Sequence, residues 1–283
     1  MKILLLFALL SVWSIARGET LKINGSTTVN LPAAEAAEEL RAEKEMDIQV
    51  DTQGGSSGGI SMLGDGQVQI GMSSKPLSDE DRAKYPKVNF HPVHIGEDAV
   101  AMVVSKDVWD GGVKSLTKDQ VQKIYEGKIT NWKDVGGPDE RIAFFNKEPG
   151  RGTWEVFAKW AYGDPKKAPE VSLPEVGGNE EARNKVSSTR GAVTELSSSW
   201  ADGKKAFAVG LKDHSGNVMM PTRDNIATHK YPMSRPLFLI TNGEPAGEAK
   251  TFVDYMLSDR GQALVKKHGY LALDQLKGSA AQE

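Results

Sequence analysis

Apolar and polar residues alternate along the chain in a pattern that predicts strands separated by helices. Residues 21–25 (LKING) and 46–53 (MDIQVDTQ) have the period of two that is typical of half-buried strands. Between them, residues 30–45 (NLPAAEAAEELRAEKE) predict a helix with Pro32 near its start. Strands that alternate with helices favour an α/β fold.

The alternation continues over the rest of the chain, without a repeat or a long linker. Strands are predicted at 68–74 (VQIGMSS), 141–146 (RIAFFN), 206–210 (AFAVG) and 235–242 (RPLFLITN), with two adjoining strands inside 88–107 (VNFHPVHIGEDAVAMVVSKD). Helices are predicted within 54–66, at 117–127 with a capping box of Thr117 and Gln120, at 154–163, over the long region 247–269, and from a helix start at Thr189 (TRGAV).

Length and composition agree with one large or two smaller globular domains. The chain has 283 residues, of which 39% are apolar and 26% charged, so it can bury a substantial core. Its formal net charge of −3 lacks the basic excess of a nucleic-acid binder, and we expect no nucleic acid partner. The five histidines lack the H-E-x-x-H arrangement of a helical zinc site, and we predict neither a metal nor a cofactor.

The first residues (MKILLLFALLSVWSIARGET) are organised like a secretory signal peptide. A lone Lys2 precedes an apolar core from Ile3 to Ala16, and an A-x-G step predicts cleavage after Gly18. A membrane anchor is the alternative, but the core is shorter than the ~20 residues of a spanning helix. The chain has no cysteine, which excludes cysteine catalysis and a lipid-modified cysteine after the signal. We therefore expect a soluble, periplasmic protein.

Small residues and hydroxyls recur at the ends of four predicted strands, in the stretches NGSTT (24–28), GGSSGG (54–59), MSSK (72–75) and GRGT (150–153). In open α/β sheets, ligands bind beyond the carboxyl ends of the strands, where helix N-termini direct free N–H groups. Each stretch alone fits an ordinary turn or helix cap, but four together predict an anion site. Neither G-x-x-x-x-G-K-[ST] nor G-x-G-x-x-G is present, so a small oxyanion is expected rather than a nucleotide.

These stretches also carry a resemblance to a known family. NGSTTV, QGGSSGGI, IGMSSKPLSDED, KITNWKDVGG, KEPGRGTWEVF and SRPLFLI resemble segments of the phosphate-binding proteins of phosphate-specific ABC transporters, over nearly all of the mature chain. The resemblance implies a type II periplasmic-binding-protein fold, with two α/β lobes and a ligand in the cleft between them. It implies that residues 19–97 and 231–283 form lobe one and that residues 98–230 form lobe two.

The resemblance also implies a set of phosphate-binding residues. They are Ser26, Thr27 and Thr28 in the first loop, Ser56 with the adjacent Ser57 in the second, Arg151, Gly152 and Thr153 in the GRGT loop, and Thr189 as a weaker candidate. This chain departs from the family's pattern at positions that affect the charge of the site. Many relatives have Ser at the position of Arg151 and Arg at that of Lys147, so either residue could supply the cation. Many have Asp where this chain has Ser74, although relatives with Ser are familiar too.

The function implied is that of a monomeric binding protein, which captures inorganic phosphate and delivers it to a membrane permease without catalysing a reaction. Another tetrahedral oxyanion, sulfate or phosphonate, is the alternative within this class. Outside it, a secreted phosphate-ester hydrolase is the alternative, and SLTK (115–118) matches S-x-x-K, although Thr117 is better explained as a helix cap. Two questions stay open: whether Glu148 replaces the acceptor lost at Ser74, and whether Asp98 is a hinge residue or a solvated strand start.

Overall fold

The computed structural model describes residues 19–276, so the predicted signal peptide, residues 1–18, lies outside the described residues. Its strands are β1 (Leu21–Gly25), β2 (Ile48–Asp51), β3 (Ile70–Ser73), β4 (Phe90–Ser105), β5 (Ser115–Thr117), β6 (Ala143–Lys147), β7 (Glu175–Val176), β8 (Ala192–Ser197), β9 (Ala206–Lys212), β10 (Val218–Met219) and β11 (Ser234–Asn242). Strands alternate with helices along most of the chain, and the predicted α/β class is confirmed.

The α-helices are α1 (Asn30–Lys44), α2 (Gly55–Gly64), α3 (Asp79–Lys84), α4 (Lys106–Asp110), α5 (Lys118–Tyr125), α6 (Gly152–Tyr162), α7 (Asn179–Ser188), α8 (Arg223–Ala227), α9 (Gly247–Leu257) and α10 (Asp259–Lys267). Short 3-10 helices cover Trp132–Val135, Pro165–Lys167, Ser198–Trp200 and Leu273–Leu276. The capping box predicted for α5 is confirmed, because the Thr117 hydroxyl and the Gln120 side chain bond to each other's backbone N–H. Over residues 19–276 we find no helix with the length and apolarity needed to span a membrane.

One sheet runs through the whole molecule in the order β2-β1-β3-β11-β4-β8-β6-β7, with β9 beside β4. Strand β4 makes this possible. Its first part pairs with β11, from Phe90 to Ala99, and its last part pairs with β8 and β9. The prediction of two adjoining strands here is wrong. The chain stays extended throughout, and a shift of register opposite Leu237 and Phe238 absorbs the irregularity within one strand.

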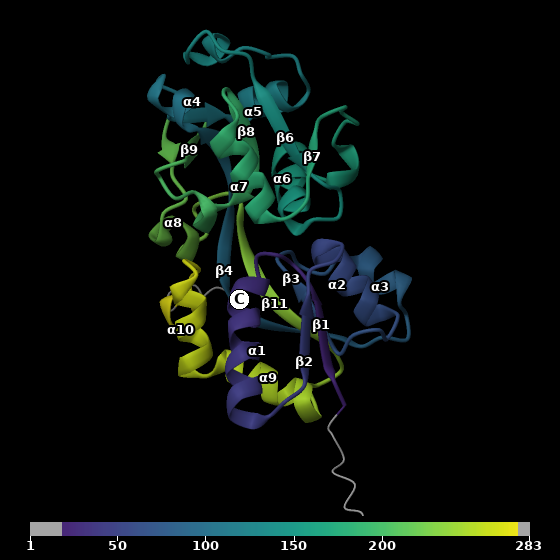
Figure 1. The fold of residues 1–283 in the computed structure, drawn as a ribbon. Helices are drawn as coiled ribbons and strands as arrows, with labels where there is room; N and C mark the ends of the chain where they lie inside the picture. The colour runs from purple at the N-terminus through teal and green to yellow at the C-terminus, as the bar shows by residue number, and fades with distance from the viewer. Residues whose placement is uncertain (1–18, 277–283) are drawn as a thin grey trace, which may run out of the picture.

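The fold has two lobes, and β4 and β11 run side by side from one to the other (Figure 1). In lobe one, an apolar cluster between the sheet and helices α1, α9 and α10 includes Leu21, Leu40 and Phe252, and a smaller cluster lies under α2. Two further clusters form the core of lobe two. The exact lobe boundaries stay a prediction. Tyr231 and Met233, which it places in lobe one, pack in the core of lobe two.

Two helix predictions are corrected by the structure. The TRGAV stretch does not begin a helix, since α7 ends at Ser188 and the chain turns at Gly191 with φ of +67°. The following residues are all buried in β8, where apolar side chains pack on both faces. The long C-terminal region is two helices, because Ser258 adopts an extended conformation that ends α9 and caps α10.

Candidate functional site

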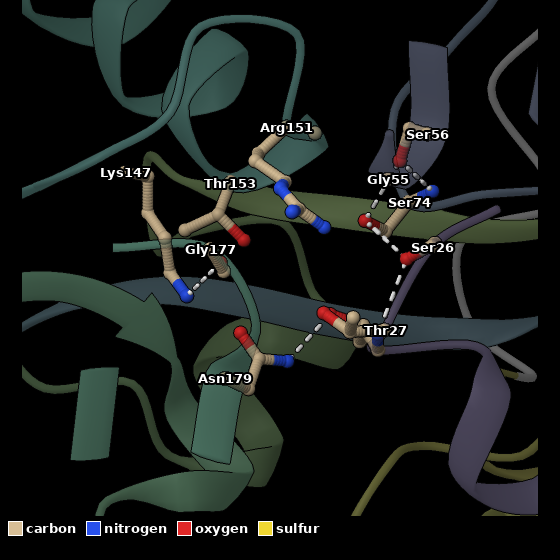
Figure 2. A pocket seen from close by; sticks show the side chains of 12 residues that line it. Ser26, Thr27, Gly55, Ser56, Ser74, Lys147, Arg151, Thr153, Gly177 and Asn179 are labelled. Carbon is tan, nitrogen blue, oxygen red and sulfur yellow. Dashed lines mark hydrogen bonds between the residues drawn. The ribbon is translucent and has the colours of Figure 1, made fainter. Parts of the chain in front are cut away.

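A pocket lies between the two lobes, at the ends of β1, β2, β3 and β6 (Figure 2). It holds about 210 Å³, including the part open to solvent. Its lining residues are Ser26, Thr27, Thr28, Gly55, Ser56, Ser74, Lys147, Arg151, Gly152, Thr153, Gly177 and Asn179. The four stretches of small residues and hydroxyls thus converge, as expected from strands whose carboxyl ends meet at one edge.

The lobe-one wall is a connected group of serine hydroxyls. Ser26 Oγ accepts hydrogen bonds from the backbone N–H groups of Thr28 and Val29, at 3.2 and 3.4 Å, and donates to Ser74 Oγ at 2.9 Å. Ser56 Oγ accepts from the Ser74 N–H at 3.1 Å and lies 3.4 Å from Ser74 Oγ. All three serines are buried, so the hydroxyls are held in place before any ligand arrives.

Glycine allows the two lobes to approach closely at this wall. Gly152 begins α6 in lobe two, and a Cβ atom on it would come 2.6 Å from Ser56 Oγ and 2.8 Å from Ser74 Oγ. Gly55 begins α2 in lobe one with φ of +58°, and a Cβ atom there would come 2.7 Å from Arg151 Cδ. The first turns of α2 and α6 therefore meet at the pocket. Their free N–H groups give it a positive potential.

Arg151 extends its guanidinium into the pocket from the residue before α6 (Figure 2). Its Nε and Nη2 donate to Glu148 Oε2 at 2.9 and 2.6 Å. The Arg151 side chain is only 16% exposed, whereas that of Glu148 is 44% exposed. Glu148 uses only two of the guanidinium nitrogens, and a guanidinium stays protonated in proteins. Arg151 therefore remains a charged donor at the pocket.

Lys147, at the end of β6, has a different environment. It is buried, and its Nζ donates to the carbonyl oxygens of Gly177 and Gly178 at 2.9 and 2.7 Å. Burial lowers the pKa of Lys147 to about 7, and the negative charge of nearby Glu195 opposes this shift. Burial raises the pKa of Glu195 to about 7, while the Lys147 backbone N–H, which donates to Glu195 Oε1 at 2.6 Å, opposes that shift. Lys147 is therefore the weaker of the two candidate cations near neutral pH.

Sequence reasoning missed an ion pair beside the pocket. Arg235 on β11 and Asp98 on β4 are register partners, and each side chain is only 1% exposed. Arg235 Nε and Nη2 donate to Asp98 Oδ2 at 3.1 and 2.7 Å, and Asp98 Oδ1 accepts from Ser197 Oγ at 3.0 Å. Asp98 is thus a buried residue of the crossover rather than a solvated strand start. A charge inside each of two apolar strands was the available signal for this pair.

Asn179, at the start of α7, was also missed, since it lies in a polar stretch that offered no distinguishing pattern. Two predicted residues, in contrast, do not line the pocket. Thr189 lies past the far end of α7, so the helix separates it from the pocket. Ser57 contacts the other lobe instead, where its Oγ donates to Glu155 Oε1 at 3.0 Å. The Oε2 of the same Glu155 pairs with buried Lys75 at 2.8 Å, so the lobes are also joined outside the pocket.

The fold and the site together define a class: a two-lobed α/β protein that encloses a small polar ligand between its lobes. The model of the PBP superfamily domain matches residues 14–260. The phosphate-binding protein PstS of Bacillus subtilis is 32% identical, over 93% of this chain and 85% of its own length. PstS of Borreliella burgdorferi is 30% identical, over 89% of each chain. This chain belongs to the PBP superfamily, and within it to the phosphate-binding proteins of ABC transporters, which confirms the resemblance.

Solved structures lead to the same family. A putative phosphate ABC transporter substrate-binding protein from Clostridium perfringens, with bound phosphate, aligns with a TM-score of 0.78 and 29% identity, over 90% of this chain and 100% of that one. An ABC-type phosphate transport receptor from Vibrio cholerae aligns with a TM-score of 0.69 and 30% identity, over 89% and 99%. The two-lobed fold predicted from the sequence is confirmed by these alignments.

Proposed function

We propose that this protein captures inorganic phosphate between its lobes and delivers it, outside the cytoplasm, to the membrane permease of an ABC transporter. One observation carries the proposal: hydroxyls from three loops of lobe one and the N-terminal turn of α6 face one pocket between the lobes. Such a site supplies N–H and O–H donors, which match the acceptor oxygens of a tetrahedral oxyanion. The family binds and transfers its ligand, and we expect no catalysed reaction.

Closure of the lobes explains how the protein would release water and hold the anion. Gly152 of lobe two lies close to Ser56 and Ser74 in lobe one, so the donors of lobe two join the preformed hydroxyls of lobe one only when the lobes meet. The anion would then exchange water for donors that need little rearrangement. Arg151 adds a charge-assisted contact, which supports its assignment over Lys147 as the main cation.

A second oxyanion is favoured by a specific residue. Ser74, where many relatives have Asp, is a buried hydroxyl that accepts from Ser26, and a hydroxyl can both donate and accept. A carboxylate at this place would repel an anion without a proton to give, whereas serine would not. Sulfate or phosphonate is therefore the candidate that remains beside phosphate.

Calorimetry with purified protein tests the proposal directly. Titration with inorganic phosphate should give a saturable heat with one site per monomer, and sulfate at the same concentration should bind more weakly. A heat with sulfate alone would overturn the assignment of phosphate. Release of phosphate from a chromogenic phosphate ester would instead support the hydrolase alternative.

We further propose that the mature protein begins at Glu19, acts as a monomer, and closes lobes that follow the predicted division into 19–97 with 231–283 and 98–230, except that Tyr231 and Met233 pack with the second lobe. The apolar N-terminal run before the A-x-G step supports the first of these. Intact-mass measurement of the exported protein should find Glu19 at the N-terminus. A full-length species retained in the membrane would contradict it.

A further inference from the structure

The Thr28 hydroxyl accepts hydrogen bonds from two fixed donors that sequence reasoning missed. Arg235 Nη2 donates to Thr28 Oγ1 at 3.1 Å, and Asn179 Nδ2 donates to the same oxygen at 3.0 Å. Both donors and the threonine are buried. Figure 2 shows the Asn179 amide directed at the loop that carries Thr27, which is the loop of Thr28.

These two contacts determine what Thr28 can offer a ligand. A hydroxyl oxygen has two lone pairs and one proton. A guanidinium has no acceptor and stays protonated, and an amide NH₂ group also only donates. With both lone pairs of Thr28 occupied, the hydroxyl can use only its proton, and Thr28 lines the pocket. Thr28 is therefore a donor and cannot accept a proton from a ligand.

Thr153, on the opposite lobe, is restricted in the same sense but less completely. Arg235 Nη1 donates to Thr153 Oγ1 at 3.0 Å, which uses one of its two lone pairs. Arg235 thus makes four hydrogen bonds, to Asp98, Thr28 and Thr153. Because Asp98 neutralises its charge, Arg235 acts on the pocket by orienting hydroxyls rather than by attracting an anion. Arg151, in contrast, acts on the pocket by attracting the anion.

Closure of the lobes decides whether Thr28 accepts both hydrogen bonds, because the two donors come from different parts of the fold. Thr28 follows β1 in lobe one, Arg235 lies on the crossover strand β11, and Asn179 begins α7 in lobe two. Only when the lobes close can Asn179 reach Thr28 and occupy its second lone pair. In an open form Thr28 would keep a free lone pair and could accept a proton.

We propose that Asn179 and Arg235 are positioning residues that make the Thr28 hydroxyl an obligate donor on closure, so that this corner of the pocket accepts only an unprotonated oxygen of the oxyanion. The inference rests on the proposed phosphate function and deepens it. The proton of a hydrogen phosphate must then face another part of the pocket. The hydroxyl of Ser74 accepts from Ser26 at 2.9 Å and lies 3.4 Å from Ser56 Oγ, a pair in which either oxygen can donate. When Ser74 is the donor in that pair, it keeps a free lone pair for the proton of the ligand.

Four phosphate titrations by calorimetry test this: wild type, Thr28→Val, Asn179→Ala and the double variant. Thr28→Val should weaken binding on the order of 30-fold, since a charge-assisted hydrogen bond is lost, and Asn179→Ala about 5-fold. If Asn179 acts through Thr28, the double variant should bind within about 2-fold of Thr28→Val alone. Thr28→Ser keeps the hydroxyl and should restore affinity. Asn184→Ala, an exposed asparagine on the same helix, is the matched control.

A pH profile separates positioning from a purely structural role. Lowering the pH from about 8 to about 6 adds a proton to much of the phosphate, and a donor-only corner should then bind it less well. Asn179→Ala gives Thr28 back a lone pair, so its affinity should fall less with pH than that of wild type. Lys147, Arg151, Glu148, Glu195 and Tyr270 also surround this region, and the comparison with wild type cancels their titration.

The outcomes distinguish the inference from the function on which it rests. Wild type that gives no heat with phosphate would overturn the proposed function itself. Wild type that binds, together with additive losses in the double variant or parallel pH profiles, would overturn the positioning role alone. If Thr28→Val does not fold, the pH profiles of Asn179→Ala and Asn184→Ala still decide between the two.

Discussion

The two walls of the pocket differ in chemistry. Lobe one contributes only glycine, serine and threonine, namely Ser26, Thr27, Thr28, Gly55, Ser56 and Ser74. Lobe two contributes the charged side chains of Lys147 and Arg151, with Glu148 and Glu195 in contact behind them. The serines of lobe one bond to one another and to backbone N–H groups. In lobe two, Arg151 pairs with Glu148, and the Lys147 ammonium bonds to two carbonyl oxygens.

This difference separates two tasks. A wall of hydroxyls that bond to one another can match the shape of a tetrahedral anion, but it attracts the anion only weakly from water. A wall with a guanidinium attracts it strongly, but with little discrimination between anions of similar size. Affinity should therefore respond most to changes that keep the walls apart or discharge lobe two. Selectivity should respond to changes in lobe one.

The largest expected effect comes from preventing the walls from meeting. Gly152→Ala places a methyl group where Ser56 Oγ and Ser74 Oγ would lie 2.6 and 2.8 Å away. Turning either hydroxyl aside breaks the serine network, so phosphate affinity should fall on the order of 1,000-fold. Calorimetry measures this, and melting without phosphate should show an unchanged fold.

Gly178→Ala is the matched control for this variant, since its added Cβ atom would lie 3.6 Å from Thr27 Cγ2, an ordinary contact. It should bind phosphate nearly as wild type does. Equal losses in both variants would mean that any added methyl group near the pocket interferes. The close approach at Gly152 would then have no special importance.

Removing the charge of lobe two should have the second largest effect. Arg151→Ala should weaken phosphate binding by a factor on the order of 100, because a charge-assisted contact of ~2–4 kcal/mol is lost. Lys147→Ala should weaken it less, since burial lowers the pKa of Lys147 to about 7 and its Nζ already bonds to two carbonyl oxygens. The reverse order in calorimetry would show that Lys147 is the main cation.

Much of this site could be predicted from local sequence, and the part that could not has a physical reason. The GSTT, GGSSGG and GRGT stretches carry their own turn and cap chemistry, so their place at strand ends was visible. Arg235 and Asp98 are distant in sequence and meet only because β4 and β11 pair in one register. No local pattern reports a register between strands that are far apart. Asn179 likewise depends on where one lobe closes on the other.

In the fold, too, the features that local sequence did not predict depend on contacts between distant segments. A helix start was predicted at Thr189, but the AVTELS segment that follows is buried throughout and forms the central strand β8. Two adjoining strands were predicted inside residues 88–107, yet pairing with β11 keeps the chain extended as the single strand β4. Tertiary packing decided both cases against the local signal.

The buried carboxyl of Glu195 in lobe two predicts a smaller effect, which concerns the stability of the fold. Burial raises the pKa of Glu195 from 4.5 to about 7, so the folded state binds a proton that the unfolded state has released between these pH values. Stability from this group is therefore full below about pH 4.5 and falls as the pH rises through about 7, by about 3 kcal/mol. Glu195→Gln should remove this fall. Denaturant unfolding of both proteins at several pH values measures the difference, and parallel curves would contradict the assignment.

The smallest expected effect tests the neutral wall itself. Wild type should distinguish phosphate from sulfate only modestly, by about 10-fold or less, because Ser74 can donate to either anion. Ser74→Asp introduces a carboxylate that accepts the proton of hydrogen phosphate and repels sulfate, so discrimination should increase. Discrimination that leaves buried groups unpaired can reach a factor of ~10⁴.

Competition calorimetry at about pH 6 and about pH 8, on wild type, Ser74→Asp and Glu148→Gln, measures this selectivity. Glu148 is included because it lies beside the pocket with Oε2 bonded to Arg151, and it is the carboxylate able to replace the missing acceptor. Loss of sulfate rejection only in Glu148→Gln would assign the acceptor role to Glu148. Strong rejection of sulfate in wild type and in Glu148→Gln alike would contradict weak selectivity. In that case Thr28 would still contact an unprotonated oxygen of the phosphate, and the phosphate proton would be accepted by a group other than Ser74 or Glu148.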